Sequence, residues 1–526
     1  MNDSYTKENI FTHMVSQWKE LLDVDEIEQI DDFFALGGDS FLAAKLLEII
    51  NSTYQIDVSL PVFFKNSTVV KLVGYIHKLV CQPNNYHLPS LEKIKRAAYP
   101  LSFYQFPLLL DEYLYPDHNY MMTFALAFSG TINRNFLKRA ICLMMERHKI
   151  LTTKFVLMEE EFHQQEDPEI NTSVLNKQFQ FITTDKPVEG SRVFLEDSWK
   201  GNRSVESLEL FKVTFFGEEK TNTSPLIVAV RVHHTIFDDT SLNIFVRELA
   251  LIYQAFLRND SPKLPVLGFQ YHDFSFWQRN QLAKSKLFLE DQTYWKKNLS
   301  HFSETLSLPY DYTIKKGTTQ IECEQMVLEH TLVEECTQLS NKLSASRFII
   351  YLSVFVVLLY KYTQQQDFCI GIPVTNRQLP GTENLIGLFV NVLTLRFTFE
   401  GDLTITELIA YVKKVFIGAL EHQNSPSTSS YRSHSNNLKQ GPVYNVMFVL
   451  QNMSNPLLQF EEFEINICST LRSKEPFDLT LSLEEMERSM LSIKYNANLF
   501  FSNSIKRMLL YFKNILKTFH KLQLQD

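Results

Sequence analysis

Val232-His-His-Thr-Ile-Phe-Asp-Asp239 sets two imidazoles and two carboxylates between a strand-like run and a helical pattern. The run 225–232 is apolar at nearly every position, and the residues after Asp239 repeat apolar side chains at steps of three, four and seven. Rigid flanking elements hold such a turn while leaving it reachable, which makes it a common place for catalytic groups. His234 is the natural general base of this turn, because imidazole has a pKa near neutrality.

The histidine pair by itself also has a simpler explanation, in which one imidazole is buried and hydrogen-bonded and the other is exposed. A metal site is disfavoured, because adjacent residues on a strand point to opposite faces and His233 and His234 cannot easily share one ion. The spacing of metal-binding HExxH motifs is also missing around this pair. Other parts of the sequence are therefore needed to decide between a catalytic and a structural role for the two histidines.

Composition and charge limit the class of protein. A chain of 526 residues is too long for one ordinary core, so at least two units are expected. Its hydrophobic content of 45% and charged content of 21% are typical of soluble globular proteins. The net charge of -9, with no basic stripe, argues against a nucleic-acid partner. No apolar run reaches membrane-spanning length, the first residues do not resemble a secretion signal, and the six cysteines are scattered, so a cytoplasmic protein is predicted.

Residues 1–80 have the pattern of a small helical bundle, with apolar faces on successive helices. Gly37-Gly38 interrupts the chain just before Ser40, which therefore stands at a helix N-terminus. Most serines at such a position are simple N-caps. Alternatively, Ser40 is an attachment point for a phosphate-linked group, which would lie near the positive end of the helix dipole.

The stretch Phe33-Phe-Ala-Leu-Gly-Gly-Asp-Ser40 resembles the attachment loop of peptidyl carrier domains from nonribosomal peptide synthetases. The resemblance implies that Ser40 carries a 4′-phosphopantetheine arm, with Asp39 as the residue that the family expects before it. Such an arm is long enough to deliver an acyl thioester to a remote site. Its implied partners are a phosphopantetheinyl transferase and an adenylation enzyme or upstream module that loads Ser40.

Beyond a polar linker at 81–98, the chain resembles the condensation domains of the same synthetases, which make antibiotic- or siderophore-type peptides. The similarity rests on seven short segments that follow one another in the order of the family's motifs. These segments are 102–105, 147–152, 233–238, 271–279, 386–391, 442–445 and 476–481. A single match of this kind is weak, but seven in order outweigh the simpler explanation of the histidine pair.

The resemblance implies an α + α/β architecture, in which a small helical carrier bundle precedes a two-lobed domain like chloramphenicol acetyltransferase. The expected N-lobe is 99–272 and the expected C-lobe is 273–526, with a tunnel between them. Donor and acceptor arms would enter from opposite ends and meet at His234, where a thioester and an amine form an amide. His234 would either take the proton from the amine or orient it, and both roles stay open. The acceptor is a downstream carrier domain or a free amine.

Further site residues follow from the same resemblance. Asp238 and Arg279 are expected to form a buried, structural ion pair, and His233 to orient the turn. Asn445 is expected either to hydrogen-bond the substrate or to cap a strand end. Ser102 is expected to approach the site.

One departure from the family pattern affects the activity. Asp239 stands where the family has Gly, a residue that tolerates backbone angles that other side chains resist. Asp is among the better-tolerated residues at positive φ, so we expect the turn to survive. The extra carboxylate would raise the pKa of His234 and weaken it as a base, or else hold a cationic amine. Asp239 and Val392 leave open a second hypothesis, a degenerate condensation domain that docks carriers or recruits a partner enzyme.

Overall fold

The computed structural model describes most of the chain between residues 6 and 523. The residues within that range that it leaves out are 39, 55, 57, 82–87, 115–119, 131, 160, 167–178, 198–209, 218–225, 303, 313–319, 378, 428–442, 452–457, 460–462, 472–476 and 486–487.

The N-terminal unit is a bundle of short helices, as the sequence predicts. Its helices are α1 (Lys7–Leu22), α2 (Ser40–Tyr54), α3 (Leu60–Lys65) and α4 (Val69–Cys81). The side chain of Thr6 caps α1 by accepting the N–H of Asn9, and a proline in its first turn starts α3. Trp18, Phe33 and Phe63 are fully buried and pack edge to face, so aromatic burial holds the bundle together.

The first lobe of the larger domain is a six-stranded sheet in the order β12-β13-β2-β7-β6-β5. Its strands are β12 (Leu458–Gln459), β13 (Phe463–Leu471), β2 (Met121–Gly130), β7 (Leu226–His233), β6 (Phe211–Gly217) and β5 (Phe179–Thr183). The helices α6 (Arg134–Arg147), α8 (Pro187–Asp197) and α9 (Asp239–Leu257) pack with it. A small sheet, β1-β4-β3, adjoins this lobe. It consists of β1 (Tyr99–Pro100), β3 (Thr153–Met158) and β4 (Glu161–Glu166), and α5 (Gln105–Leu114) follows β1.

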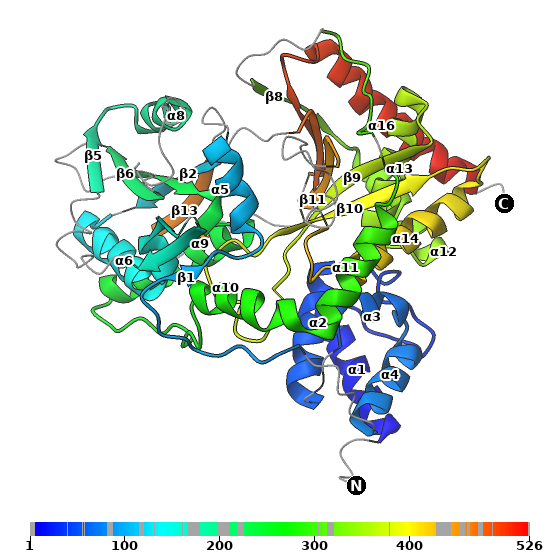
Figure 1. Ribbon diagram of the computed structural model, residues 1–526, viewed down its shortest axis with the longest axis horizontal. Helices are drawn as coiled ribbons and strands as arrows, with labels where there is room; N and C mark the ends of the chain where they lie inside the picture. The colour runs from blue at the N-terminus through cyan, green and yellow to red at the C-terminus, as the bar shows by residue number, and fades with distance from the viewer. Residues whose placement is uncertain are drawn as a thin grey trace.

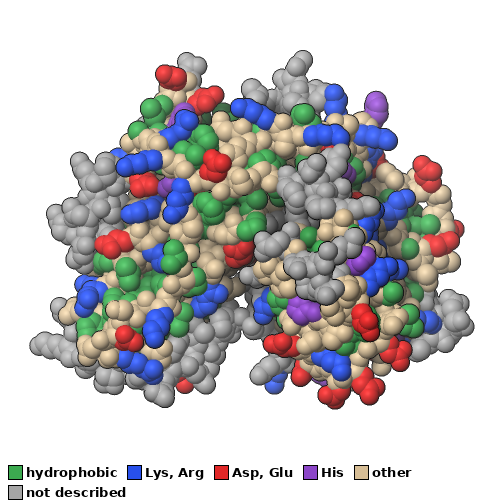
Figure 2. Space-filling model, turned by 90° about the horizontal axis from the view of Figure 1, so that it is seen from below, with side chains coloured by type: hydrophobic (Ala, Val, Ile, Leu, Met, Phe, Trp, Pro, Cys, Tyr) green, Lys and Arg blue, Asp and Glu red, His purple; other side chains and the backbone are tan. Residues whose placement is uncertain are grey.

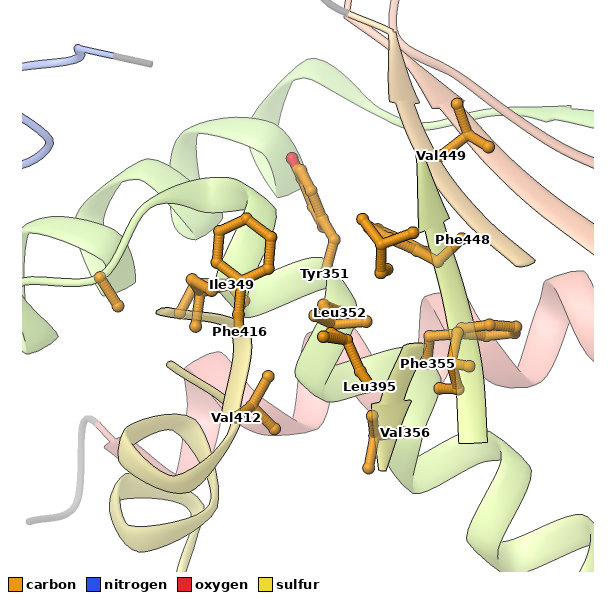
Figure 3. Packing of buried hydrophobic residues seen from close by; sticks show 14 of the residues in the cluster. Ile349, Tyr351, Leu352, Phe355, Val356, Leu395, Val412, Phe416, Phe448 and Val449 are labelled. Carbon is orange, nitrogen blue, oxygen red and sulfur yellow. The ribbon is translucent and has the colours of Figure 1, made fainter. Parts of the chain in front are cut away.

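The second lobe has its own six-stranded sheet, in the order β10-β9-β11-β14-β15-β8. Its strands are β8 (Ile321–Val327), β9 (Asp367–Val374), β10 (Asn391–Thr398), β11 (Val446–Gln451), β14 (Leu479–Glu484) and β15 (Met490–Asn496). The helices are α11 (Lys286–Asn298), α12 (His330–Leu343), α13 (Arg347–Thr363), α14 (Ile405–Glu421) and α16 (Ser502–Gln523). Figure 3 shows the apolar side chains of α13 packed together with those of the sheet, and Phe416 of α14 beside Ile349.

The two lobes form a V above the N-terminal bundle (Figure 1), but they do not divide at residue 272 in a single cut, as the sequence led us to expect. The strand β13 comes late in the chain, yet it pairs with β2 in the first lobe. Residues 385–389 also pack into the first-lobe core. Helix α10 (Tyr271–Asn280) spans the expected boundary. Two later segments of the chain therefore belong to the first lobe, where they cover an edge of its sheet and part of its apolar core.

Figure 2 shows basic and acidic side chains mixed over the face that it draws, rather than a basic field. Among the described helices, no single one has the length and apolar composition to cross a bilayer. One bent pair, α12 with α13, passes that test only when both helices are counted together across an angle of 103°.

Candidate active site

The histidine turn lies at the end of β7, held between two neighbouring strands. β7 pairs antiparallel with β2 and with β6, so that His233 lies opposite Met121. Beyond the strand, the His234 N–H donates to the carbonyl of Tyr120 at 2.8 Å. Residues His234–Ile236 then form a short 3₁₀ turn before α9 begins. The strand, turn and helix predicted around the two histidines are thus present.

His234 is the partly exposed residue in a turn whose neighbours from 232 to 238 are otherwise buried. Its Nδ1 lies 2.7 Å from the carbonyl oxygen of Phe237. A carbonyl can only accept a hydrogen bond, so the Nδ1 of the neutral ring carries the proton and donates it. The lone pair therefore resides on Nε2. This tautomer makes Nε2 the atom that can accept a proton from an incoming group.

His233 is fully buried and organises the turn from inside. Its Nε2 donates to Glu112 Oε2 at 2.9 Å, and its Nδ1 accepts the N–H of Thr235 at 3.2 Å. The other oxygen of Glu112 accepts the N–H of Tyr120 at 2.7 Å. Glu112 therefore holds both the imidazole that caps the turn and the residue whose carbonyl binds His234. No sequence signal pointed to Glu112, which lies 121 positions from His233 in an unremarkable helical pattern.

Asp238 is buried and faces away from solvent, at the start of α9. Its Oδ1 accepts the N–H of Ser241 at 2.8 Å and pairs with Arg377 Nη2 at 2.9 Å, while its Oδ2 accepts the N–H of Phe389 at 3.0 Å. Both Arg377 and Phe389 come after the boundary expected between the lobes. Asp238 therefore caps its helix and ties the histidine turn to the 377–389 segment.

Comparison with known proteins agrees with this geometry. The family model described as "Condensation domain" matches residues 95–525. The chain belongs to the condensation-domain family. Residues 14–76 match a second model, described as "Phosphopantetheine attachment site". The chain thus combines a carrier domain with a condensation domain, the class of acyltransferase that forms amide bonds in nonribosomal peptide synthetases.

The relatives are large synthetases. One of the linear gramicidin synthase chains of Brevibacillus parabrevis is 29% identical over 511 residues, which are 95% of this chain and 10% of that protein. Tyrocidine synthase 3 of the same organism is 26% identical over 507 residues, which are 95% of this chain and 8% of that protein. The chain thus spans about a tenth of the length of these relatives.

Two solved structures share the fold. The X-domain in its complex with OxyB from teicoplanin biosynthesis has a TM-score of 0.72 at 18% identity, covering 83% of this chain and 97% of that one. The first condensation domain of the calcium-dependent antibiotic synthetase has a TM-score of 0.66 at 17% identity, covering 81% and 97%.

The expected ion pair between Asp238 and Arg279 is wrong, because Asp238 pairs with Arg377. The Arg279 side chain instead donates from Nε to the carbonyl of Leu101 at 2.8 Å, and its guanidinium lies 4.3 Å from the ring centroid of Phe103. Its role is still structural, but it fixes the start of the condensation domain rather than the histidine turn. Burial lowers the pKa of Arg279, and the carboxylate of Glu161 opposes that shift.

Ser102 approaches the site only through other residues. It is fully buried, its Oγ accepts the N–H of Gln105 at 3.0 Å, and that Oγ lies 2.8 Å from the hydroxyl of Tyr271. The amide of Gln105 in turn donates to the carbonyl of Thr235 in the histidine turn at 3.0 Å. In the opening SxxQ motif, Gln105 is therefore the residue that reaches the catalytic turn, and Ser102 caps the helix that carries Gln105.

Asn445 lies in a polar cluster within the second lobe. Its Nδ2 donates to Asp478 Oδ2 at 2.7 Å and to the carbonyl of Leu306 at 2.8 Å, and it is 3.3 Å from the Tyr310 hydroxyl. These contacts favour the strand-end cap over the substrate contact. Its Oδ1 is buried and has no hydrogen-bond partner among the described residues.

Asp239 does not need the backbone freedom of the glycine that the family has there. It is the first residue of α9 and is not among the described residues with positive φ. A carboxylate in the first turn of a helix is favoured by the helix dipole. The substitution therefore leaves the backbone of the turn intact.

The attachment loop fits the group that the family match implies. Gly37 has φ of +95°, and a Cβ on Gly38 would lie 2.3 Å from the ring of Phe33. These two positions require glycine, so the loop turns tightly over the aromatic core. Ser40 is the first residue of α2, where a phosphate group would meet the N-terminal end of the helix. Asp39 lies outside the described residues.

Glu112 is expected to act as a positioning residue. Replacing it with Ala removes the acceptor that fixes the His233 tautomer, so we expect kcat for amide formation to fall about 10-fold with little change in KM. Glu112→Gln keeps one acceptor oxygen and is expected to recover part of the loss. Steady-state kinetics on both variants test this, with Glu189→Gln on the exposed face of α8 as the control. Equal kinetics in wild type and Glu112→Ala would contradict the assignment.

Proposed function

We propose that this chain transfers an acyl or peptidyl group from a thioester on Ser40 to an acceptor amine at His234. The amine nitrogen attacks the thioester carbonyl carbon, the C–N bond forms and the C–S bond breaks. The amine loses one proton, and the pantetheine sulfur leaves as the thiol. The bound 4′-phosphopantetheine supplies the thiol that carries the acyl group; the remaining tasks belong to the chain's own residues.

The observation that carries the proposal is the tautomer of His234. The Phe237 carbonyl holds the proton on Nδ1, which leaves the lone pair of the neutral ring on Nε2, and His234 itself is partly exposed. That nitrogen accepts the amine proton or orients the amine by a hydrogen bond. The buried contacts of Glu112, Gln105 and Asp238 fix the turn before any substrate arrives. Such fixed geometry supports catalysis by alignment of two reactants.

The same framework favours an active enzyme over a domain that only docks carriers. A docking platform has no need of an imidazole with a fixed tautomer, nor of a buried carboxylate that ties the turn to the 377–389 segment. An adenylation enzyme or upstream module loads Ser40 after a phosphopantetheinyl transferase has modified it, and the acceptor is a downstream carrier domain or a free amine. From these expected partners we infer that the reaction takes place in the cytoplasm.

Single-turnover transfer tests the proposal. Ser40 is charged with a small acyl-pantetheine by a phosphopantetheinyl transferase and then mixed with carrier-bound and free amines. Amide formation, followed by mass spectrometry, is expected with at least one acceptor class. Ser40→Ala, which cannot be charged, should form none. A charged wild-type chain that keeps its thioester across the whole panel would contradict condensation activity and favour the docking platform.

A further inference from the structure

The opening SxxQ motif has a second long-range contact, made by Tyr104. This residue lies between Ser102 and Gln105 and is 7% exposed. Its hydroxyl accepts the side-chain N–H of Asn376 at 2.6 Å, although the two residues are 272 positions apart. Burial raises the pKa of the Tyr104 hydroxyl, which therefore stays protonated and serves as a hydrogen-bonding group. One buried hydroxyl thus joins the opening motif to the segment that follows β9.

Asn376 lies where the chain turns from one lobe toward the other. The strand β9 of the second lobe ends at Val374, and residues 385–389 pack into the core of the first lobe. The φ angle of Asn376 is +47°, in the left-handed region where asparagine is better tolerated than most residues. The hydrogen bond to Tyr104 therefore holds the residue that sets the direction in which the chain leaves β9.

The next residue, Arg377, depends on that direction. Its guanidinium donates to the carbonyls of Thr382 at 2.9 Å and Leu385 at 2.6 Å. It also donates to the carboxylate of Asp238 at 2.9 Å. Because the peptide bond between neighbouring residues is planar, the backbone angles of Asn376 fix where the Arg377 side chain starts. Asn376 therefore aims Arg377 at Asp238.

This chain of contacts ends at His234. The Phe237 carbonyl that accepts the Nδ1 proton of His234 belongs to the planar peptide unit that joins Phe237 to Asp238. Holding Asp238 therefore also holds the orientation of that carbonyl. Gln105 holds the other part of the turn directly, through the carbonyl of Thr235 at 3.0 Å. The opening motif thus acts on the histidine turn by two separate routes.

We propose that Tyr104 and Asn376 are positioning residues for His234. Their hydrogen bond acts through the ion pair between Asp238 and Arg377, and neither residue is assigned a contact with the substrate. The inference rests on the proposed function, because it concerns the imidazole that acts on the amine. Loss of the hydrogen bond lowers the rate of transfer and leaves the binding of the amine unchanged.

A double-mutant cycle in the full chain tests the proposal. Tyr104→Phe removes the hydroxyl and keeps the buried ring, while Asn376→Gly removes the amide and keeps a residue that tolerates positive φ. Single-turnover transfer from charged Ser40 is measured at several concentrations of the accepting amine. Each variant is expected to lower the limiting rate about 5-fold, with the same half-saturating amine concentration as wild type. The double variant is expected to be about 5-fold slower rather than about 25-fold, because both changes break one contact.

The matched control is Asn259→Gly. Asn259 is also an asparagine with positive φ, at +51°, but it is exposed and lies beyond the far end of α9. It is expected to transfer at the wild-type rate. Wild-type rates in both Tyr104→Phe and Asn376→Gly would overturn the proposal, and so would effects that multiply in the double variant. A higher half-saturating concentration with an unchanged limiting rate would also overturn it. If Tyr104→Phe does not fold, the same comparison of rate and half-saturation is made with Asn376→Gly.

The ring nitrogen signals of His234 separate this proposal from the proposed function. In a chain labelled with ¹⁵N-histidine, His234→Ala identifies the signals of this imidazole. Wild type is expected to show the proton on Nδ1, and Tyr104→Phe a mixture of the two tautomers. Identical ring ¹⁵N shifts in wild type and in Tyr104→Phe would contradict the positioning role. If wild type forms no amide with any acceptor, the proposed function fails, while these shifts still decide whether Tyr104 positions His234.

Discussion

His234→Ala is expected to abolish most amide formation while leaving the attachment of phosphopantetheine to Ser40 unchanged. Removing a positioned acid–base group typically costs about 10²- to 10⁴-fold in rate. The loss should appear in kcat rather than in KM, because the Nε2 lone pair acts on the amine during the reaction. Single-turnover transfer from charged Ser40 measures it directly.

The control for His234→Ala is His330→Ala. His330 is an exposed histidine on α12, and its side chain is 83% accessible. It should transfer at the wild-type rate. A His234→Ala chain that retains more than about a tenth of the rate would show that alignment of the reactants, rather than this imidazole, supplies the acceleration.

Arg377→Met is expected to destabilise the condensation domain strongly. The ion pair between Asp238 and Arg377 is buried, because the Asp238 side chain is 1% exposed and the Arg377 side chain is 7% exposed. Removing one partner of such a pair leaves an uncompensated buried charge, which typically costs about 3–5 kcal/mol in the free energy of unfolding. Urea unfolding followed by tryptophan fluorescence measures the change.

The comparison variant is Arg279→Met. It loses one short hydrogen bond to a carbonyl and the stacking on Phe103, so we expect a smaller cost, about 1–2 kcal/mol. The double variant Asp238→Asn/Arg377→Met removes both charges and should recover part of the stability lost in Arg377→Met. If Arg279→Met lowers the free energy of unfolding more than Arg377→Met does, the ion pair between Asp238 and Arg377 is not the larger contribution to stability.

The features that the sequence predicted well are those that neighbouring residues determine. The strand before His233, the helix after Asp238 and the tight loop before Ser40 all follow from local apolar periodicity and glycine placement. The catalytic role expected of His234 stays a prediction, which the transfer experiment tests. These signals need no knowledge of distant segments.

The features that were predicted wrongly depend on residues far apart in the chain. By charge alone, either Arg279 or Arg377 could pair with Asp238. Arg377 does so because the 377–389 segment packs against the start of α9. Glu112 gave no local signal, since an acidic residue next to another one, Asp111, in a short helix is usually solvated. The pairing of β13 with β2 likewise joins residues more than 300 positions apart.

The segment before the condensation domain is tied down along α10. The indole N–H of Trp277 donates to the carbonyl of Pro89 at 2.7 Å, and Asp273 accepts the N–H of Ile94 at 2.8 Å. Only the residues between Cys81 and Leu88 separate this fixed point from the last carrier helix, and a chain of that length spans at most about 25 Å. This short linker tethers the carrier, so its thioester meets the condensation domain of the same chain at a high local concentration. A carrier domain on another molecule would have to compete from bulk solution at a lower concentration. The tether therefore makes the chain's own carrier the preferred donor, without any recognition of the acyl group.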